Sequence, residues 1–204
     1  MNINIPAPGV LDKKRLNVLQ KLALLDTPSE QVFDRLTQLA SDMVGAPVSL
    51  VSLVDKDRQF LKSSVGLPEP WHSQRQTPLT HSFCQHIVTS GQPLIIEDAR
   101  ETPLVRDNLA IRDLNVIGYL GMPLATSKGD ILGSFCVIDS QPRVWSEREI
   151  DIVRGLSLLC MSVIETRAQL MDLHQFAEER LNNALDKISE RDAEIAYLKV
   201  QIAV

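Results

Sequence analysis

Residues 117–139 read IGYLGMPLATSKGDILGSFCVID, and this stretch decides the fold. Two apolar runs of strand length flank a polar turn at residues 127–130, a pattern that predicts an antiparallel hairpin within a sheet. Alternate residues of the second run fall on opposite faces, and Gly133 leaves room for a neighbouring backbone. Since both faces are apolar or carry only small polar atoms, we expect this strand pair to be covered on both sides.

Composition and charge indicate one globular domain with an extension. The chain has 204 residues, 44% of them hydrophobic, and a net charge of -5, which suits one domain rather than two. It has no dense block of Lys and Arg, so we expect neither nucleic acid nor a membrane surface as a partner. The first residues lack a secretory pattern, which predicts a cytoplasmic protein. Cys84, Cys136 and Cys160 are widely spaced in apolar sequence, which predicts reduced, buried thiols.

The N-terminal part of the chain predicts two helices. Apolar residues share one face over Val10–Leu25, and residues 13–15 then lie on the exposed side. Thr27 and Glu30 have the spacing of a capping box, so a second helix should begin directly after Thr27. Its apolar positions repeat every 3.6 residues until Gly45 ends it.

The middle of the chain predicts strands, a long loop and one short helix. Residues 47–54 and 59–63 should form a hairpin across a polar turn. Residues 64–79 carry one glycine and three prolines, which indicates a loop long enough to cover a site. We then expect a helix from Thr80 to about Ser90, a short strand at residues 94–96 and a charged connector over residues 97–115.

A long C-terminal helix should begin at a second capping box, formed by Ser146 and Glu149. Its first turns carry two apolar stripes, one for its own sheet and one for a second subunit. Beyond residue 168 apolar residues repeat at intervals of seven, which is coiled-coil spacing. Because no C-cap precedes Val204, we expect the chain to be a fragment of a longer protein. The expected dimer interface comprises Ile152, Leu156, Leu159, Val163, Leu181, Ile188, Ile195 and Leu198.

Four blocks of sequence resemble a GAF domain: residues 24–67, HSFCQHIV at 81–88, PLIIEDAR at 93–100 and LGMPLATSKGDILGSFCVIDSQPR at 120–143. The resemblance runs from about Lys14 to Ala168. It is to the type found at the N-terminus of bacterial sensor kinases and cyclic-dinucleotide signalling enzymes. It implies an α+β fold, with an antiparallel sheet of five or six strands, terminal helices on one face and a ligand pocket on the other.

The resemblance also implies a homodimer that passes a signal from the pocket to the coiled coil. On this basis the chain divides into an N-terminal helix (1–26), a GAF sensory domain (27–168) and a C-terminal signalling helix (169–204). Asp98 and Arg112 are the charged residues best placed to face a pocket, and a solvated ion pair in a loop is the alternative for each. The expected pocket comprises Phe60, His81, Phe83, Cys84, Asp98, Arg112 and Tyr119. Neither the ligand nor a cofactor follows from the sequence.

Some of these residues also suggest other kinds of site. His81, Cys84 and His86 could indicate a metal, but on a helix His86 lies well round the axis from the other two. Cys84 lies near the position where bilin-binding relatives carry a linked cysteine, yet Gln85 rather than His directly follows it and aromatic residues make up only 4%. Free methionine sulfoxide reductases use the same fold with cysteines on mobile loops, whereas Cys136 and Cys160 are expected in a strand and a buried helix.

Two further signalling signatures are not matched. The Asn-Lys-Phe-Asp-Glu signature of some nucleotide-binding GAF domains is not recognisable. His174 lacks the acidic neighbour of a phospho-accepting histidine and reads as a polar residue of the coiled-coil seam. We therefore expect a non-catalytic sensory domain that binds a small molecule of unknown identity and signals through a dimeric coiled coil to an output domain outside this chain. The alternative is a dimerisation module without a ligand.

Overall fold

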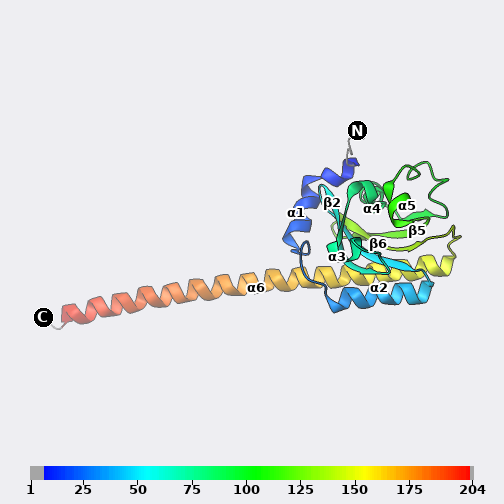
Figure 1. The fold of residues 1–204 in the computed structure, drawn as a ribbon. Coiled ribbons are helices and arrows are strands. Elements are labelled where there is room, and N and C mark those ends of the chain that lie inside the picture. Colours follow the sequence, from blue (N-terminus) through cyan, green and yellow to red (C-terminus); the bar gives the residue numbers. More distant parts are fainter. Residues whose placement is uncertain (1–6, 203–204) are drawn as a thin grey trace. The chain divides into compact units, whose positions relative to one another are not determined.

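Six strands form one antiparallel sheet, with helices on both faces (Figure 1). The computed structural model describes residues 7–202, which divide into one compact unit up to Ile164 and another from Glu165. The strands are β1 (Val48–Val54), β2 (Arg58–Val65), β3 (Gln76–Pro78), β4 (Leu94–Ile96), β5 (Gly118–Ala125) and β6 (Ile131–Asp139). Their order across the sheet is β3-β2-β1-β6-β5-β4. The expected α+β fold with five or six strands is confirmed.

Two longer helices cover one face of the sheet. They are α2 (Gln31–Val44) and the first part of α6 (Glu147–Ile202), where Ser157 Oγ donates a hydrogen bond to the carbonyl oxygen of Pro123 at 2.9 Å. The opposite face carries α4 (Cys84–Ser90) and α5 (Leu109–Leu114) (Figure 1). The remaining helices are η1 (Pro8–Leu11), α1 (Lys13–Lys21), α3 (Trp71–Gln74) and η2 (Leu79–His81). Between residues 7 and 202, no helix has the length and apolar character needed to cross a membrane.

The long C-terminal helix is confirmed, whereas its coiled-coil pairing stays a prediction. The expected segment boundaries at residues 26 and 168 also stay predictions. The parts of the terminal segments that fall on residues 1–6 and 203–204 lie outside the described residues.

Strand β6 packs very closely against β1 at Gly133. The two strands pair antiparallel, with Gly133 opposite Leu53. A Cβ atom at Gly133 would lie 1.9 Å from the carbonyl oxygen of Ser52, far closer than non-bonded atoms approach. Strand β6 also pairs antiparallel with β5, so the hairpin predicted over residues 117–139 and the room predicted at Gly133 are both confirmed.

The segment before α2 does not form the predicted capping box. The helix begins at Gln31, and Thr27 Oγ1 donates to the carbonyl oxygen of Leu24 at 2.8 Å while accepting from Lys62 Nζ at 2.6 Å. Lys62 is fully buried in β2, and its Nζ also lies 2.5 Å from Glu30 Oε1. A buried ammonium requires partners for its charge and its protons. Lys62 therefore takes the two side chains that would otherwise cap the helix.

Arg15 is buried, so the expectation that residues 13–15 are exposed was wrong for this side chain. Its guanidinium donates to the carbonyl oxygens of Val54 at 2.7 Å and Val10 at 2.6 Å. The predicted single helix over this region is divided into η1 and α1, and Asp12 caps α1 by accepting from the backbone nitrogen of Arg15 at 2.7 Å. The long arginine side chain thus ties the N-terminal segment to the end of β1.

The predicted loop over residues 64–79 contains regular structure. It includes α3 and the edge strand β3, which pairs antiparallel with β2. Proline is tolerated on an edge strand because one side of that strand needs no donor, so Pro78 does not prevent β3. The next helix begins at Cys84 rather than after Thr80, because η2 occupies residues 79–81.

Two of the helix ends predicted from local sequence signals are confirmed. Gly45 adopts a left-handed conformation with φ of 67° and ends α2. At the start of α6, Ser146 N and Oγ each donate to Glu149 Oε2 at 2.7 Å, and Glu149 N donates back to Ser146 Oγ at 3.4 Å. These are the reciprocal bonds of a capping box.

One residue of the expected dimer interface lies inside its own domain. Leu156 is 5% exposed, because it shares a face of α6 with the buried residues Val153 and Cys160. Leu159 lies on the other face and is 55% exposed. The two predicted stripes are therefore present, but Leu156 belongs to the stripe that packs within the domain.

We expect Gly133→Ala to lower the free energy of unfolding by about 3 kcal/mol or more, because the added methyl group forces β6 away from β1. Urea denaturation followed by circular dichroism measures the change. Gly155→Ala is the matched control, since a Cβ there meets no atom within 4 Å and alanine favours a helix by roughly 1 kcal/mol over glycine. Equal stability of the two variants would contradict the close packing at Gly133.

Candidate functional site

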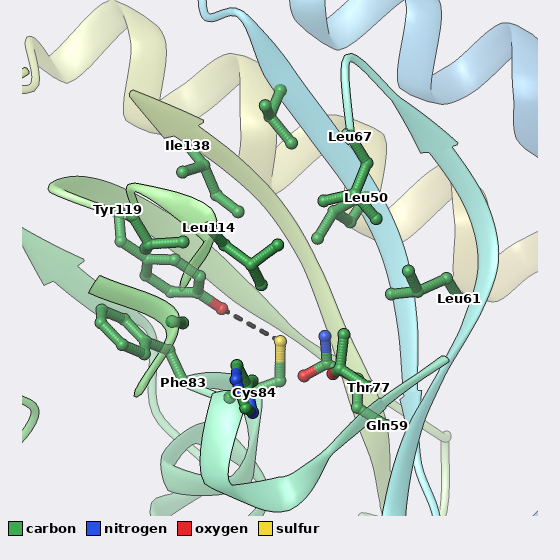
Figure 2. A pocket seen from close by; sticks show the side chains of 14 residues that line it. Leu50, Gln59, Leu61, Leu67, Thr77, Phe83, Cys84, Leu114, Tyr119 and Ile138 are labelled. Carbon is green, nitrogen blue, oxygen red and sulfur yellow. Dashed lines mark hydrogen bonds between the residues drawn. The ribbon is translucent and has the colours of Figure 1, made fainter. Parts of the chain in front are cut away.

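A small cavity lies between the sheet and the short helices on one of its faces (Figure 2). Its volume is about 30 Å³, which is room for about two water molecules. Most of its wall is apolar, and the polar groups come from β2, β3, η2, α4 and β5. The lining residues are Val48, Leu50, Gln59, Leu61, Leu67, Thr77, His81, Phe83, Cys84, Ala110, Leu114, Val116, Tyr119 and Ile138.

The structure brings four of the seven expected pocket residues to this cavity, namely His81, Phe83, Cys84 and Tyr119. Phe60 is buried in β2 but does not line the cavity. Its neighbours Gln59 and Leu61 line it instead, and successive residues of a strand point to opposite faces. Phe60 therefore lies on the other side of the sheet, where the Arg75 guanidinium lies 5.2 Å from its ring centroid.

Asp98 and Arg112 form surface ion pairs and do not face the cavity. Asp98 Oδ2 lies 2.5 Å from Arg100 Nη2, and Arg112 Nε lies 2.6 Å from Asp113 Oδ1. The side chain of Arg112 is 74% exposed. The hydrogen bond from Arg112, followed by that from His81, lowers the pKa of Asp113 to about 2. Exposed pairs of this kind add little stability. They correspond to the alternative given above for Asp98 and Arg112, a solvated ion pair in a loop.

Gly121 makes room for the ring of Tyr119 on strand β5. A Cβ atom at Gly121 would lie 2.6 Å from Tyr119 Oη and 2.7 Å from Ile87 Cδ1. The ring therefore lies over its own strand, and its hydroxyl reaches Cys84 Sγ at 3.3 Å (Figure 2) and Ser134 Oγ at 3.2 Å. The absence of a side chain at position 121 thus determines where the Tyr119 hydroxyl lies.

Cys84 is surrounded by hydrogen-bonding groups from strands β5 and β6. Ser134 Oγ donates to Cys84 Sγ at 3.0 Å. The hydrogen bond from Cys136, followed by those from Ser134 and Tyr119, lowers the pKa of Cys84 to about 6, against the opposing effect of burial. The bond to Cys84 and burial raise the pKa of Cys136 well above its usual value, and burial raises the pKa of Tyr119. Cys136 and Tyr119 therefore keep their protons at neutral pH and can donate to the Cys84 sulfur.

The other candidate chemical groups are already occupied or enclosed. All three cysteines are free and buried, and burial raises the pKa of Cys160 to about 12. The ring nitrogens of His81 lie 3.0 Å from Thr80 Oγ1 and 3.0 Å from Asp113 Oδ2. Within residues 7–202, no group of three or more His, Cys, Asp or Glu side chains is placed to hold a metal ion.

Sequence reasoning missed Gln59 and Thr77 as cavity residues. The signal for Gln59 was the alternation along residues 59–63, which places it on the same face as Leu61. Thr77 reaches the cavity because β3 pairs with β2 and sets Thr77 opposite Gln59. Since the sequence did not predict β3, it offered no comparable signal for Thr77.

A groove on the opposite side of the domain separates α2 from α6. Its volume is about 400 Å³, and its lining residues are Gln31, Val32, Arg35, Leu36, Leu159, Ser162 and Val163. Leu39 and Met43 extend the exposed apolar surface along α2. Of the expected dimer residues, Ile152 and Val163 are partly buried, while Leu159, Leu181, Ile188, Ile195 and Leu198 are exposed.

Known proteins match this chain in sequence and in fold. The GAF domain family model matches residues 28–164, which is well over half of the chain. Over 157 residues the chain is 32% identical to a cyclic di-GMP phosphodiesterase of Pseudomonas aeruginosa, and the match covers 76% of this chain and 26% of that protein. The chain therefore spans about a quarter of the length of this relative.

Two solved structures illustrate the shared fold. The GAF domain of an Acinetobacter phosphoenolpyruvate-protein phosphotransferase superposes with a TM-score of 0.56 at 18% identity, over 76% of this chain and 95% of that chain. A type II free methionine-R-sulfoxide reductase from Thermoplasma acidophilum superposes with a TM-score of 0.55 at 12% identity, over 67% of this chain and 92% of that chain. At these identities the similarity is one of fold alone.

We expect the folded protein to show a thiolate ionisation near pH 6, arising from Cys84. An unfolded cysteine ionises near pH 8.5. Because the folded pKa is the lower one, ionisation stabilises the folded state increasingly as the pH rises from about 6 to about 8.5, and this contribution is lost as the pH falls through the folded pKa. Ultraviolet titration and urea denaturation across this range measure the two effects.

Cys84→Ser keeps a hydrogen-bonding group at this position and should abolish both effects. Cys160→Ser, in a separate part of the core, should abolish neither. Identical titrations of the wild type and Cys84→Ser would contradict the assignment.

Proposed function

Since the chain belongs to the GAF domain family, we propose that it is a non-catalytic sensory module of a cytoplasmic signalling protein. It binds a small molecule in the cavity and relays the change through a dimeric coiled coil to an output domain. The observation that carries this proposal is the placement of the cavity and of an exposed apolar helix surface on opposite faces of one sheet.

The central strands connect the two faces. On β6, Ile138 lines the cavity, whereas the adjacent residue Val137 and the buried Phe135 point to the side of α2 and α6 by strand alternation. A ligand that displaces Ile138 therefore acts on residues packed beneath the helices. For a signal to pass, the ligand must bind one arrangement of the helices more tightly than the other.

Exposed apolar side chains support a homodimer. Leu39 and Met43 of α2 and Leu159 of α6 are about half exposed around the groove. Along the later part of α6, exposed Leu181, Ile188 and Ile195 repeat at intervals of seven. Apolar surfaces of this kind mark interaction sites, and the sevenfold repeat suits a coiled coil. A second copy of the chain offers the same surfaces, so that two-fold pairing would cover both.

The output domain is the part of the proposal that rests on the relatives. The Pseudomonas aeruginosa relative is named as a cyclic di-GMP phosphodiesterase, and the region matched by this chain makes up 26% of it. We infer that the enzymatic activity of such a protein belongs to the other regions. The present chain would then regulate an output domain of this general kind.

A dimerisation module without a ligand is the second candidate function. The small volume of the cavity, about 30 Å³, favours it, because ligand sites usually measure about 300–1,000 Å³. Native mass spectrometry of freshly purified protein distinguishes the two candidates. A retained small molecule would support the sensory function, and its absence would favour the dimerisation module.

We expect Leu159→Glu to weaken the homodimer at least about tenfold, which corresponds to about 1.4 kcal/mol. The reason is that the second copy of the chain would cover the groove between α2 and α6 and bury the introduced charge. Sedimentation equilibrium measures the dimer Kd. Leu158→Glu is the matched control, since Leu158 is also exposed but does not line the groove, and it should change the Kd by less than about threefold. A wild-type chain that remains monomeric at tens of micromolar, or equal losses in the two variants, would contradict the proposed interface.

A further inference from the structure

Gln59 and Thr77 place two polar side chains side by side at one wall of the cavity. They are directly opposed residues of the β2–β3 pair, so their side chains share a face. Figure 2 shows them as neighbours at the edge of the cavity, which both of them line. Gln59 is 4% exposed and Thr77 is 2% exposed. Buried polar groups of this kind normally have partners.

Hydrogen bonds within the protein leave one group of each side chain unused. Ser82 Oγ accepts from the backbone nitrogen of Gln85 at 3.2 Å and donates to Gln59 Oε1. This arrangement identifies the amide nitrogen of Gln59 as the end that is free to donate into the cavity. Thr77 Oγ1 has no hydrogen-bond partner among the described residues. An unpaired buried hydroxyl costs free energy, and a ligand that bonds to it removes this cost.

Apart from His81, Cys84 and Tyr119, the rest of the wall is apolar, and it offers no positive charge to an anion. Hydrocarbon surface comes from Leu50, Leu61, Leu67, Leu114, Val116 and Ile138. His81 also lines the cavity, but Thr80 and Asp113 already engage its two ring nitrogens. The lining residues include no Lys, Arg, Asp or Glu. An anionic ligand would therefore lose its hydration without gaining a counter-charge.

From these contacts we propose that the cavity binds a compact, uncharged, mainly apolar molecule through a carbonyl or carboxamide group. This inference rests on the proposed function, because it specifies the class of ligand for the same cavity. The carbonyl oxygen of the ligand accepts hydrogen bonds from Gln59 Nε2 and from the Thr77 hydroxyl. The hydrocarbon part of the ligand packs against the leucine side chains. Nucleotides do not fit this class, because they carry phosphate charge.

The cavity must widen to admit such a molecule. Its present volume of about 30 Å³ holds about two water molecules. Leu67 and Leu114 are the wall residues best placed to move, because Leu67 follows the end of β2 and Leu114 is the last residue of α5. Ligand binding should therefore displace Leu67 and Leu114 from their present positions in the cavity wall.

Three probes of similar shape test the ligand class on the full chain. They are cyclopentanone, its hydrocarbon analogue methylenecyclopentane, and the anion cyclopentanecarboxylate. Amide NMR titration should show saturable binding of cyclopentanone with shifts at cavity residues. Methylenecyclopentane should bind about fivefold more weakly, because it makes neither hydrogen bond, and the carboxylate should not bind.

The isosteric variant Thr77→Val separates a binding role from a structural one. It should weaken cyclopentanone binding about threefold or more, while the midpoint of urea denaturation stays unchanged or rises because an unpaired hydroxyl is removed. Thr37→Val is the matched control. Thr37 is also buried, but its hydroxyl bonds to Phe33 O at 3.2 Å and Ser63 Oγ at 2.8 Å on the other side of the sheet. This variant should lose stability and keep its affinity for cyclopentanone.

The possible failures are distinguishable. Binding of the carboxylate or the hydrocarbon as tightly as the ketone overturns the ligand class but leaves a ligand-binding cavity. If Thr77→Val binds cyclopentanone as tightly as the wild type does, the ligand class is likewise overturned, and a ligand-binding cavity remains. If none of the three probes binds, the ligand class is also overturned. If native mass spectrometry then finds no retained molecule, the sensory function is overturned as well.

Discussion

The close approach of β6 to β1 at Gly133 is the constraint on which the rest of the fold depends. Only a residue without a Cβ atom lets the carbonyl oxygen of Ser52 lie where it does, and this contact accompanies the pairing of the two central strands. Because strand residues alternate between faces, this register directs Cys136 and Ile138 to the cavity side and Phe135 to the helix side. A shift by one residue would reverse both faces at once.

Two groups of buried polar side chains in this domain differ in how completely they are paired. The Lys62 ammonium has an ion-pair partner in Glu30 and a hydrogen-bond acceptor in Thr27, so it ties β2 to the segment before α2. On the other face Thr77 Oγ1 is unpaired among the described residues. Buried polar groups are normally paired. The paired Lys62 ammonium therefore stabilises the fold, whereas the unpaired Thr77 hydroxyl marks the place where we propose that a ligand binds.

Local signals in the sequence predicted several elements correctly, and long-range contacts account for the errors. The capping box at Ser146 and the stop at Gly45 depend on residues only a few positions apart, and both are present. Thr27 carries an equally good local signal, yet Lys62 draws it away from the helix. Phe60 was expected in the pocket, whereas strand alternation places Gln59 and Leu61 at the cavity instead.

By itself the sequence determined the family, through four blocks of residues spread along the chain. It also determined the central hairpin and the start of the last helix, because these follow from residues close together along the chain. It also indicated the segment that carries Cys84 and Phe83. Only the tertiary structure decided which polar groups meet: Thr77 reaches the cavity through the pairing of β3 with β2, and Tyr119 reaches Cys84 across the space left by Gly121. Contacts between distant segments carry an entropic cost that only the complete core offsets, so no local pattern reports them.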